Sequence, residues 1–213
     1  LDELAVVKSF REPMRNTPDV LAARLGASHA RQWLTPDGGN APQYLVNRYA
    51  HAISQGEASF VALTGAEAMD NGRRLIKSGV KPDWRVASDE DAQLLFPDRE
   101  MCTAHEKAHG VWIASLVYPL FENALRGHYG HTIAEHQKAM GELFEPFSTV
   151  AERTPGAWFP TARSADEIAT PTSSNRYVGW PYTKFMNAMN QVNQSAFVLL
   201  CSVARAKARG IDP

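Results

Sequence analysis

The sequence predicts an α/β fold in which helices cover a mostly parallel sheet, because strand and helix patterns alternate along its first third. The apolar run Leu4–Val7 is typical of a buried strand, and Asp19–Leu25 has the pattern of a helix. A second helix is expected over Gln43–Gln55. It is followed by a strand at Phe60–Leu63, which runs directly into Thr64–Met69 at the start of another helix. Two successive strand–helix units of this kind are typical of βαβ connections.

The middle of the chain predicts a helical insertion between strand-rich parts. Residues 79–100 are polar and irregular, so we expect them on the surface. Helices are expected over Pro119–His128 and Ile133–Glu152, and the second begins with Thr132 and Glu135 at capping-box spacing. Apolar residues at helical spacing predict the buried side of the first helix and an apolar stripe on the second: Leu120, Phe121, Ala124 and Leu125, then Met140, Phe144, Phe147 and Val150.

The last part of the chain returns to strands. Ser164 and Glu167 form another possible capping box before a short helical turn. Strands are expected at Arg176–Gly179 and Ala196–Ser202, with a closing helix over Val203–Arg209.

Composition limits the possible partners. The chain has 213 residues, 44% of them hydrophobic, and 22 basic against 23 acidic residues give a formal net charge of −1. This balance predicts neither a nucleic-acid partner nor a membrane surface, and it favours a small ligand. The most apolar stretches, Val111–Phe121 and Ala196–Val203, are shorter than the ~20 residues that a spanning helix needs.

Two features concern the cellular context of the chain. Cys102 and Cys201 are too few for a disulfide framework, so we expect a reducing compartment, the cytoplasm. The first residues, Leu1–Leu4, contain no initiator methionine or signal-peptide pattern, and we expect the chain to begin inside a fold.

The turn Gly38-Gly39-Asn40 before the second helix is the most informative segment. Together with Gly56 and the run Thr64–Met69, it resembles the thiolase pattern in which Cys-Gly-Ser-Gly opens a helix and the next strand leads into Gly-Gly-x-Glu-Ser-Met. The chain is thus similar to the thiolase superfamily. Counting back from Gly56 places the nucleophilic cysteine of that family at Gly39, so the catalytic residues of this chain are unknown.

The missing cysteine restricts the chemistry. A thiolase cysteine at a helix amino terminus attacks the thioester as a thiolate, which glycine cannot do. Backbone N–H groups at Gly38, Gly39 and Asn40 can still receive a thioester oxygen, and we expect this turn to bind substrate. The alternative is a tight strand-to-helix turn with no function.

A second block resembles the loop domain of sterol carrier protein X-type thiolases, which are usually named acetyl-CoA acetyltransferases. It comprises Tyr118–Arg126, Gly130, His136, Phe147 and Ala157–Phe159. The resemblance implies a thiolase amino-terminal half over residues 1–79, a mostly helical loop domain over 80–175, and over 176–213 the end of that half with the start of the carboxy-terminal half. For Phe121, Phe144 and Phe147, the alternative is core packing between two helices.

A third block, Asn193–Ala196, resembles the family sequence Asn-Asp-Gly-Ala. On this register the family serine beside the thioester falls at Asn190, which keeps a hydrogen-bonding side chain. Lys184 is the best candidate for a cation near the coenzyme A phosphates, although a plain surface lysine is the alternative. Asn193 itself is expected to be a structural turn residue.

Two clusters resemble catalytic or metal sites. Cys102, His105, Glu106 and His109 lie close together, but no second ligand pair has zinc-like spacing, and we expect no metal. For His128, His131 and His136, near the start of a helix, we expect solvated or capping roles.

The resemblance implies a protein that acts on acyl-CoA thioesters in lipid or sterol metabolism by breaking or forming carbon–carbon bonds. Coenzyme A thioesters would be substrates, with no covalently bound cofactor. A homodimer is also implied. The other catalytic elements of the family, a Gly-His-Pro histidine and a second cysteine among them, do not occur in this sequence. Because the nucleophilic cysteine is missing at Gly39, a non-catalytic acyl-CoA or lipid-binding protein is the alternative.

Overall fold

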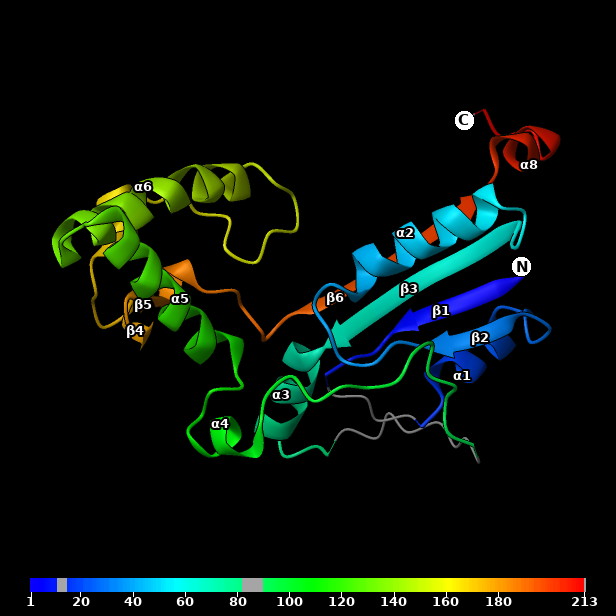
Figure 1. Cartoon of the computed structure of the whole chain (residues 1–213), viewed down its shortest axis with the longest axis horizontal. Coiled ribbons are helices and arrows are strands. Elements are labelled where there is room, and N and C mark those ends of the chain that lie inside the picture. Colours follow the sequence, from blue (N-terminus) through cyan, green and yellow to red (C-terminus); the bar gives the residue numbers. More distant parts are fainter. Residues whose placement is uncertain (11–14, 82–89, 213) are drawn as a thin grey trace. The chain divides into compact units, whose positions relative to one another are not determined.

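The computed structural model describes residues 1–10, 15–81 and 90–212. The chain forms two compact units, described separately below (Figure 1). The first unit combines Leu1–Arg99 with the segment from Gln191 to the end of the chain, and the second comprises Glu100–Asn190. The division into family domains at residues 79/80 and 175/176 stays a prediction.

The first unit is built on a four-stranded sheet. Its strands are β1 (Glu3–Val7), β2 (Arg31–Leu34), β3 (Phe60–Ala68) and β6 (Asn193–Cys201), in the order β2-β1-β3-β6. β1 is parallel to β2 and β3, while β6 is antiparallel to β3. The predicted α/β class with a mostly parallel sheet is confirmed.

Helices cover the central strands β1 and β3, which are apolar on both faces. On one face, α2 (Ala41–Ser54) packs Leu45 and Tyr49 against alternate residues of β1 and β3. On the other face, α1 (Thr17–Arg24) packs Ala22 against Leu4 and Val6. α3 (Met69–Lys77) follows β3, and α8 (Val203–Ala208) follows β6 (Figure 1).

β3 and β2 differ most from the predictions, and β6 begins at Asn193 instead of the predicted Ala196. β3 continues to Ala68, five residues beyond the predicted end at Leu63, because β6 pairs with it along the whole register from Phe60↔Cys201 to Ala68↔Asn193. β2 was not predicted at all. Within the surface segment 79–100, of which residues 82–89 lie outside the described residues, Leu94 pairs with Leu34 and extends the contacts of β2.

The second unit is mainly helical. It contains α4 (Ala104–Ala108), α5 (Ala114–Tyr129), α6 (Ile133–Glu152), α7 (Ala165–Ala169), a hairpin of β4 (Tyr177–Gly179) and β5 (Tyr182–Thr183), and the 3-10 helix η1 (Lys184–Met186). The bounds of α6 agree with the prediction, and both predicted capping boxes, at Thr132 and Ser164, are present. Both capping boxes could be predicted because the two residues of each box are only three positions apart in the sequence.

α5 begins at Ala114 rather than at the predicted Pro119, so a proline lies inside the helix. Proline cannot donate the hydrogen bond that the carbonyl of Ser115 would otherwise accept. Gly179 of β4 packs at this place, since a Cβ atom there would lie 2.4 Å from the Ser115 carbonyl oxygen. Glycine at position 179 therefore lets the hairpin approach the helix.

The predicted buried side of α5 is wrong. Leu120, Phe121 and Leu125 are 59%, 60% and 44% exposed, and Pro119 is the only buried residue of the helix. The core of the second unit is instead formed by Met140 of α6 with residues of α7 and η1. The stripe on α6 is also buried only in part, because Phe147 and Val150 are exposed.

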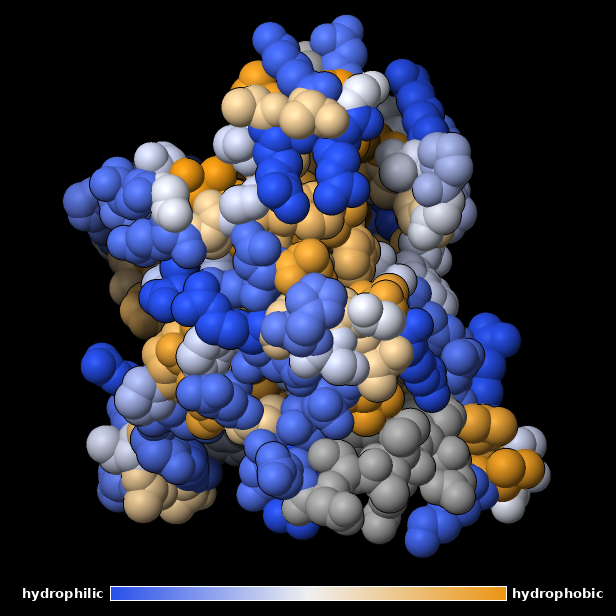
Figure 2. All heavy atoms as spheres, turned by 90° about the vertical axis from the view of Figure 1, so that its right-hand side faces the viewer, coloured by the Kyte–Doolittle hydropathy of each residue, from blue (hydrophilic) through white to orange (hydrophobic). Residues whose placement is uncertain are grey.

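Other apolar side chains also reach the surface. On the face shown in Figure 2, hydrophilic residues predominate and smaller hydrophobic patches lie between them. Among the described residues, no helix is long and apolar enough to cross a membrane.

Candidate functional site

The turn that precedes α2 lies at the carboxyl ends of the parallel strands. Its residues Gly38, Gly39 and Asn40 follow β2 and lead directly into the helix. Gly39 is exposed, and a Cβ atom there would meet no heavy atom within 4 Å. At Gly38 a Cβ atom would lie 3.0 Å from Asn40 Oδ1, so the asparagine side chain lies over Gly38. The structure thus brings these three predicted residues together.

The start of α2 offers backbone donors. Asn40 is the N-cap residue but makes no capping hydrogen bond through its side chain. The N–H of Ala41 donates to the Gly38 carbonyl at 3.0 Å, and Pro42 has no N–H group. The N–H groups of Gly39, Asn40 and Gln43 have no partner among the described residues. These groups, with the positive end of the helix dipole, can bind an anion or a polarised carbonyl oxygen.

Polar side chains also lie at the carboxyl ends of these strands. The buried Thr35 hydroxyl accepts a hydrogen bond from the backbone N–H of Lys8 at 3.1 Å. Lys8 Nζ forms an ion pair with Asp37 Oδ2 at 3.0 Å, immediately before the turn. Ligands bind beyond the carboxyl ends of the strands in open α/β sheets, so this position suits a binding site.

Glu67 has a contact that the sequence did not predict. Its carboxylate accepts hydrogen bonds from Ser9 Oγ at 2.9 Å and from the N–H of Phe10 at 3.0 Å. Glu67 thereby ties the end of β3 to the segment that follows β1. Its place in the Thr64–Met69 run was the available signal, but the run identified no partner for it.

Neither cysteine lies in the turn. Cys201 pairs with Phe60 at the amino-terminal end of β3, whereas the turn lies beyond the carboxyl end of β2, at the other end of the strands. Cys102 belongs to the second unit, and both thiols are free and half-buried. In the described part of the chain, no group of three or more His, Cys, Asp and Glu side chains could hold a metal ion.

The remaining predicted binding residues belong to the second unit. Lys184 is the exposed first residue of η1, and Asn190 is exposed at the end of this unit. Their participation in one site with the Gly38–Asn40 turn stays a prediction. Asn193 is the first residue of β6 rather than the predicted turn residue, and its side chain exchanges two hydrogen bonds with Asn71 at 3.0 and 3.1 Å.

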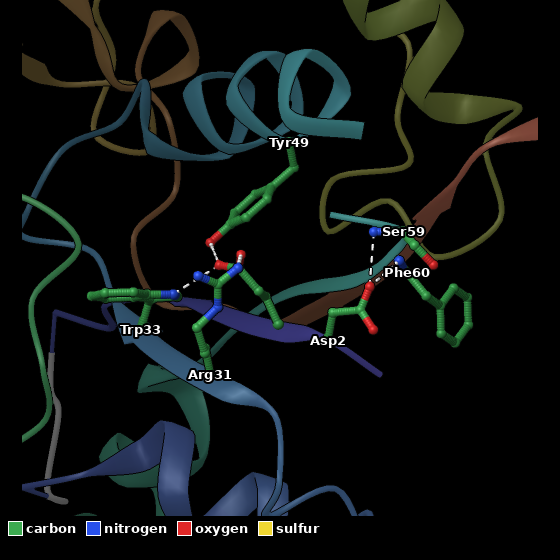
Figure 3. Close-up of polar contacts among 7 residues, drawn as sticks. Asp2, Arg31, Trp33, Tyr49, Ser59 and Phe60 are labelled. Carbon is green, nitrogen blue, oxygen red and sulfur yellow. Dashed lines mark hydrogen bonds and ion pairs between the residues drawn. The ribbon is translucent and has the colours of Figure 1, made fainter. Parts of the chain in front are cut away.

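A second polar cluster in the first unit fixes α2 on the sheet (Figure 3). The buried Glu3 carboxylate accepts hydrogen bonds from Tyr49 Oη and Trp33 Nε1, both at 2.9 Å, and pairs with Arg31. Burial, with the bond to Glu3, raises the pKa of Tyr49 above its usual range. Because three elements meet at Glu3, the cluster sets the position of α2 and hence of its first turn.

The second unit contains a polar cluster around Glu122 of α5. His136 Nε2 lies 2.7 Å from Glu122 Oε1, and the Tyr182 hydroxyl donates to Glu122 Oε2. His136 is 5% exposed, so the predicted solvated or capping role is wrong for this histidine. Burial, together with the Glu122 bond, raises the pKa of Tyr182. The cluster joins α5, α6 and β5.

Several solved structures are similar to this chain, and two of them are described here. A monomeric SCP2-thiolase like protein type 1 from Mycobacterium smegmatis is 32% identical, with a TM-score of 0.75 over 100% of this chain. The Ltp2-ChsH2(DUF35) aldolase is 16% identical, with a TM-score of 0.63 over 97% of this chain. The chain has a thiolase-like fold.

This thiolase-like chain spans only part of its relatives, 38% of the first chain's length and 46% of the second. No family model and no curated protein matches it. The comparisons support the expected thiolase-like fold, of the sterol carrier protein kind, whereas the acetyl-CoA acetyltransferase naming stays a prediction.

Proposed function

We propose that this thiolase-like chain binds acyl-CoA thioesters at the start of α2 and belongs to an enzyme of lipid or sterol metabolism. The observation that carries the proposal is the uncapped turn at Gly39, in the family's nucleophile position. Its N–H groups lack partners among the described residues and it has room for a ligand. A thioester oxygen is a suitable acceptor for these donors.

The chemistry that fits this turn is carbon–carbon bond cleavage or formation without an acyl-enzyme. Glycine at position 39 cannot attack a thioester, so acetyl transfer through a covalent intermediate, as the acetyl-CoA acetyltransferase name implies, lacks its nucleophile. A retro-aldol reaction needs only a base and a polarised carbonyl. One of the solved structures with a similar fold is named an aldolase, which supports this choice.

The second candidate is a non-catalytic acyl-CoA or lipid-binding protein. It is favoured by the same glycine, because binding requires the donors of the turn but no nucleophile.

A homodimer belongs to either proposal, and sedimentation that shows only monomer at high protein concentration would count against it. Lys184 is proposed to contact the coenzyme A phosphates, and Asn190 the thioester end.

Titration calorimetry of the chain with acetyl-CoA tests the site. In Gly39→Val the added side chain enters open space and an ordinary backbone conformation, so folding is expected to be unaffected while acetyl-CoA affinity falls about tenfold or more. Ala50→Val is the matched control, since Ala50 is exposed in the later part of α2. Equal affinity in both variants would show that the turn has only a structural role.

A further inference from the structure

α5 is amphipathic, but its polar side faces the second unit and its apolar side is exposed. Its inward residues are Pro119 and the polar series Glu122, Asn123 and Arg126, all buried or half-buried. The helix residues on its remaining surface are mostly apolar and exposed: Leu116, Tyr118, Leu120, Phe121, Leu125 and Tyr129. A helix attached to a core ordinarily buries its apolar side. Polar contacts therefore carry a large share of the attachment of α5.

The Glu122 carboxylate makes the central contact. One oxygen meets His136 of α6 at 2.7 Å, and the other accepts the hydroxyl proton of Tyr182 from β5. His136 is further placed by His131, whose Nδ1 lies 3.3 Å from His136 Nδ1. With one carboxylate oxygen bonded to α6 and the other to β5, Glu122 holds the polar side of α5 toward the unit.

The core beneath α5 does not depend on this helix. It contains Met140 of α6, Ile168 and Ala169 of α7, and Met186 of η1, and none of its buried or flanking members belongs to α5. On its inward side, Asn123 Oδ1 and Arg126 Nε are buried without a hydrogen-bond partner among the described residues. Opening α5 therefore leaves the members of this core in place and exposes two polar atoms that lack partners.

We propose that α5 is a hinged strap, that Glu122 is its latch, and that the strap opens while α6, α7 and η1 stay folded. Gly130, with a φ of +68°, ends α5 and provides the hinge before α6. Segments that open in this way are those with few buried apolar contacts.

Amide hydrogen exchange of the whole chain tests this inference. Glu122→Gln keeps the shape of the side chain but weakens both bonds, so exchange within Ala114–Tyr129 should accelerate about tenfold or more while Ile133–Glu152 is unchanged. Tyr182→Phe removes one bond and keeps the ring, so it should give a smaller acceleration in the same helix. Glu142→Gln is the control, because Glu142 is exposed on α6 and only 3.7 Å from Lys138.

Two results would overturn the proposal. Equal acceleration of α5 and α6 would show that the two helices open as one cooperative unit. Unchanged exchange of α5 would show that Glu122 is no latch. If Glu122→Gln does not fold, Tyr182→Phe decides by the same comparison of the two helices.

Discussion

Replacing Tyr49 with phenylalanine should destabilise the first unit by removing one of the bonds to Glu3. Tyr49 is 2% exposed, and its hydroxyl donates to Glu3 Oε2 at 2.9 Å. The aromatic ring stays in place between α2 and the sheet, so the variant removes little apolar packing. What changes is the number of hydrogen bonds to a buried carboxylate.

The size of the effect follows from the kind of bond. A hydrogen bond to a charged group contributes about 1.5–3 kcal/mol to the free energy of unfolding. For a chain of this size, such a loss lowers the melting temperature by roughly 3–12 °C. Trp33 Nε1 and Arg31 still bind Glu3 in the variant, so the carboxylate is not left alone.

Thermal unfolding followed by circular dichroism measures the change, with urea unfolding as an independent check. Tyr118→Phe is the matched control, because Tyr118 is 61% exposed on α5 and has no hydrogen-bond partner among the described residues. A loss below about 0.5 kcal/mol in Tyr49→Phe, which is typical of surface substitutions, would refute the reasoning that the Glu3 cluster holds α2 on the sheet.

Three further predictions concern pH, catalysis and helix capping. The pKa values of Tyr49 and Tyr182 are raised in the folded state. The stability that their protonated hydroxyls contribute is therefore complete below about pH 10 and is lost as the pH rises through the folded-state pKa values. In an absorbance titration these two tyrosines should ionise after the others, and simultaneous ionisation of all six would contradict this prediction. Incubation with acetyl-CoA should release no coenzyme A above background, because Gly39 replaces the nucleophile; an acetyl group trapped on Cys102 or Cys201 would prove the register wrong. Thr132→Ala removes the side-chain acceptor for the Glu135 N–H at 3.2 Å and should cost about 1 kcal/mol in a urea titration, whereas an unchanged midpoint would mean that the cap contributes nothing.

Local sequence determined the elements whose signals lie within a few neighbouring residues. The capping box at Thr132 fixed the start of α6, and the apolar run of β1 marked a buried strand. The turn at Gly38–Asn40 was also placed correctly before a helix, since glycine, asparagine and proline act on their own backbone. For the candidate site, the sequence therefore identified the backbone donors but not their surroundings.

Only the tertiary structure decided which surfaces are covered. β3 extends to Ala68 because β6, more than a hundred residues later in the chain, pairs with it, and no local pattern contains that partner. The apolar residues of α5 predicted an inward side, yet Glu122 turns its polar side inward through bonds to α6 and β5. Apolar residues at helical spacing show that a helix has an apolar side, but they do not show what lies against it. The elements that pack against the helix, and the side chains that bond to its carboxylates, come from distant parts of the chain.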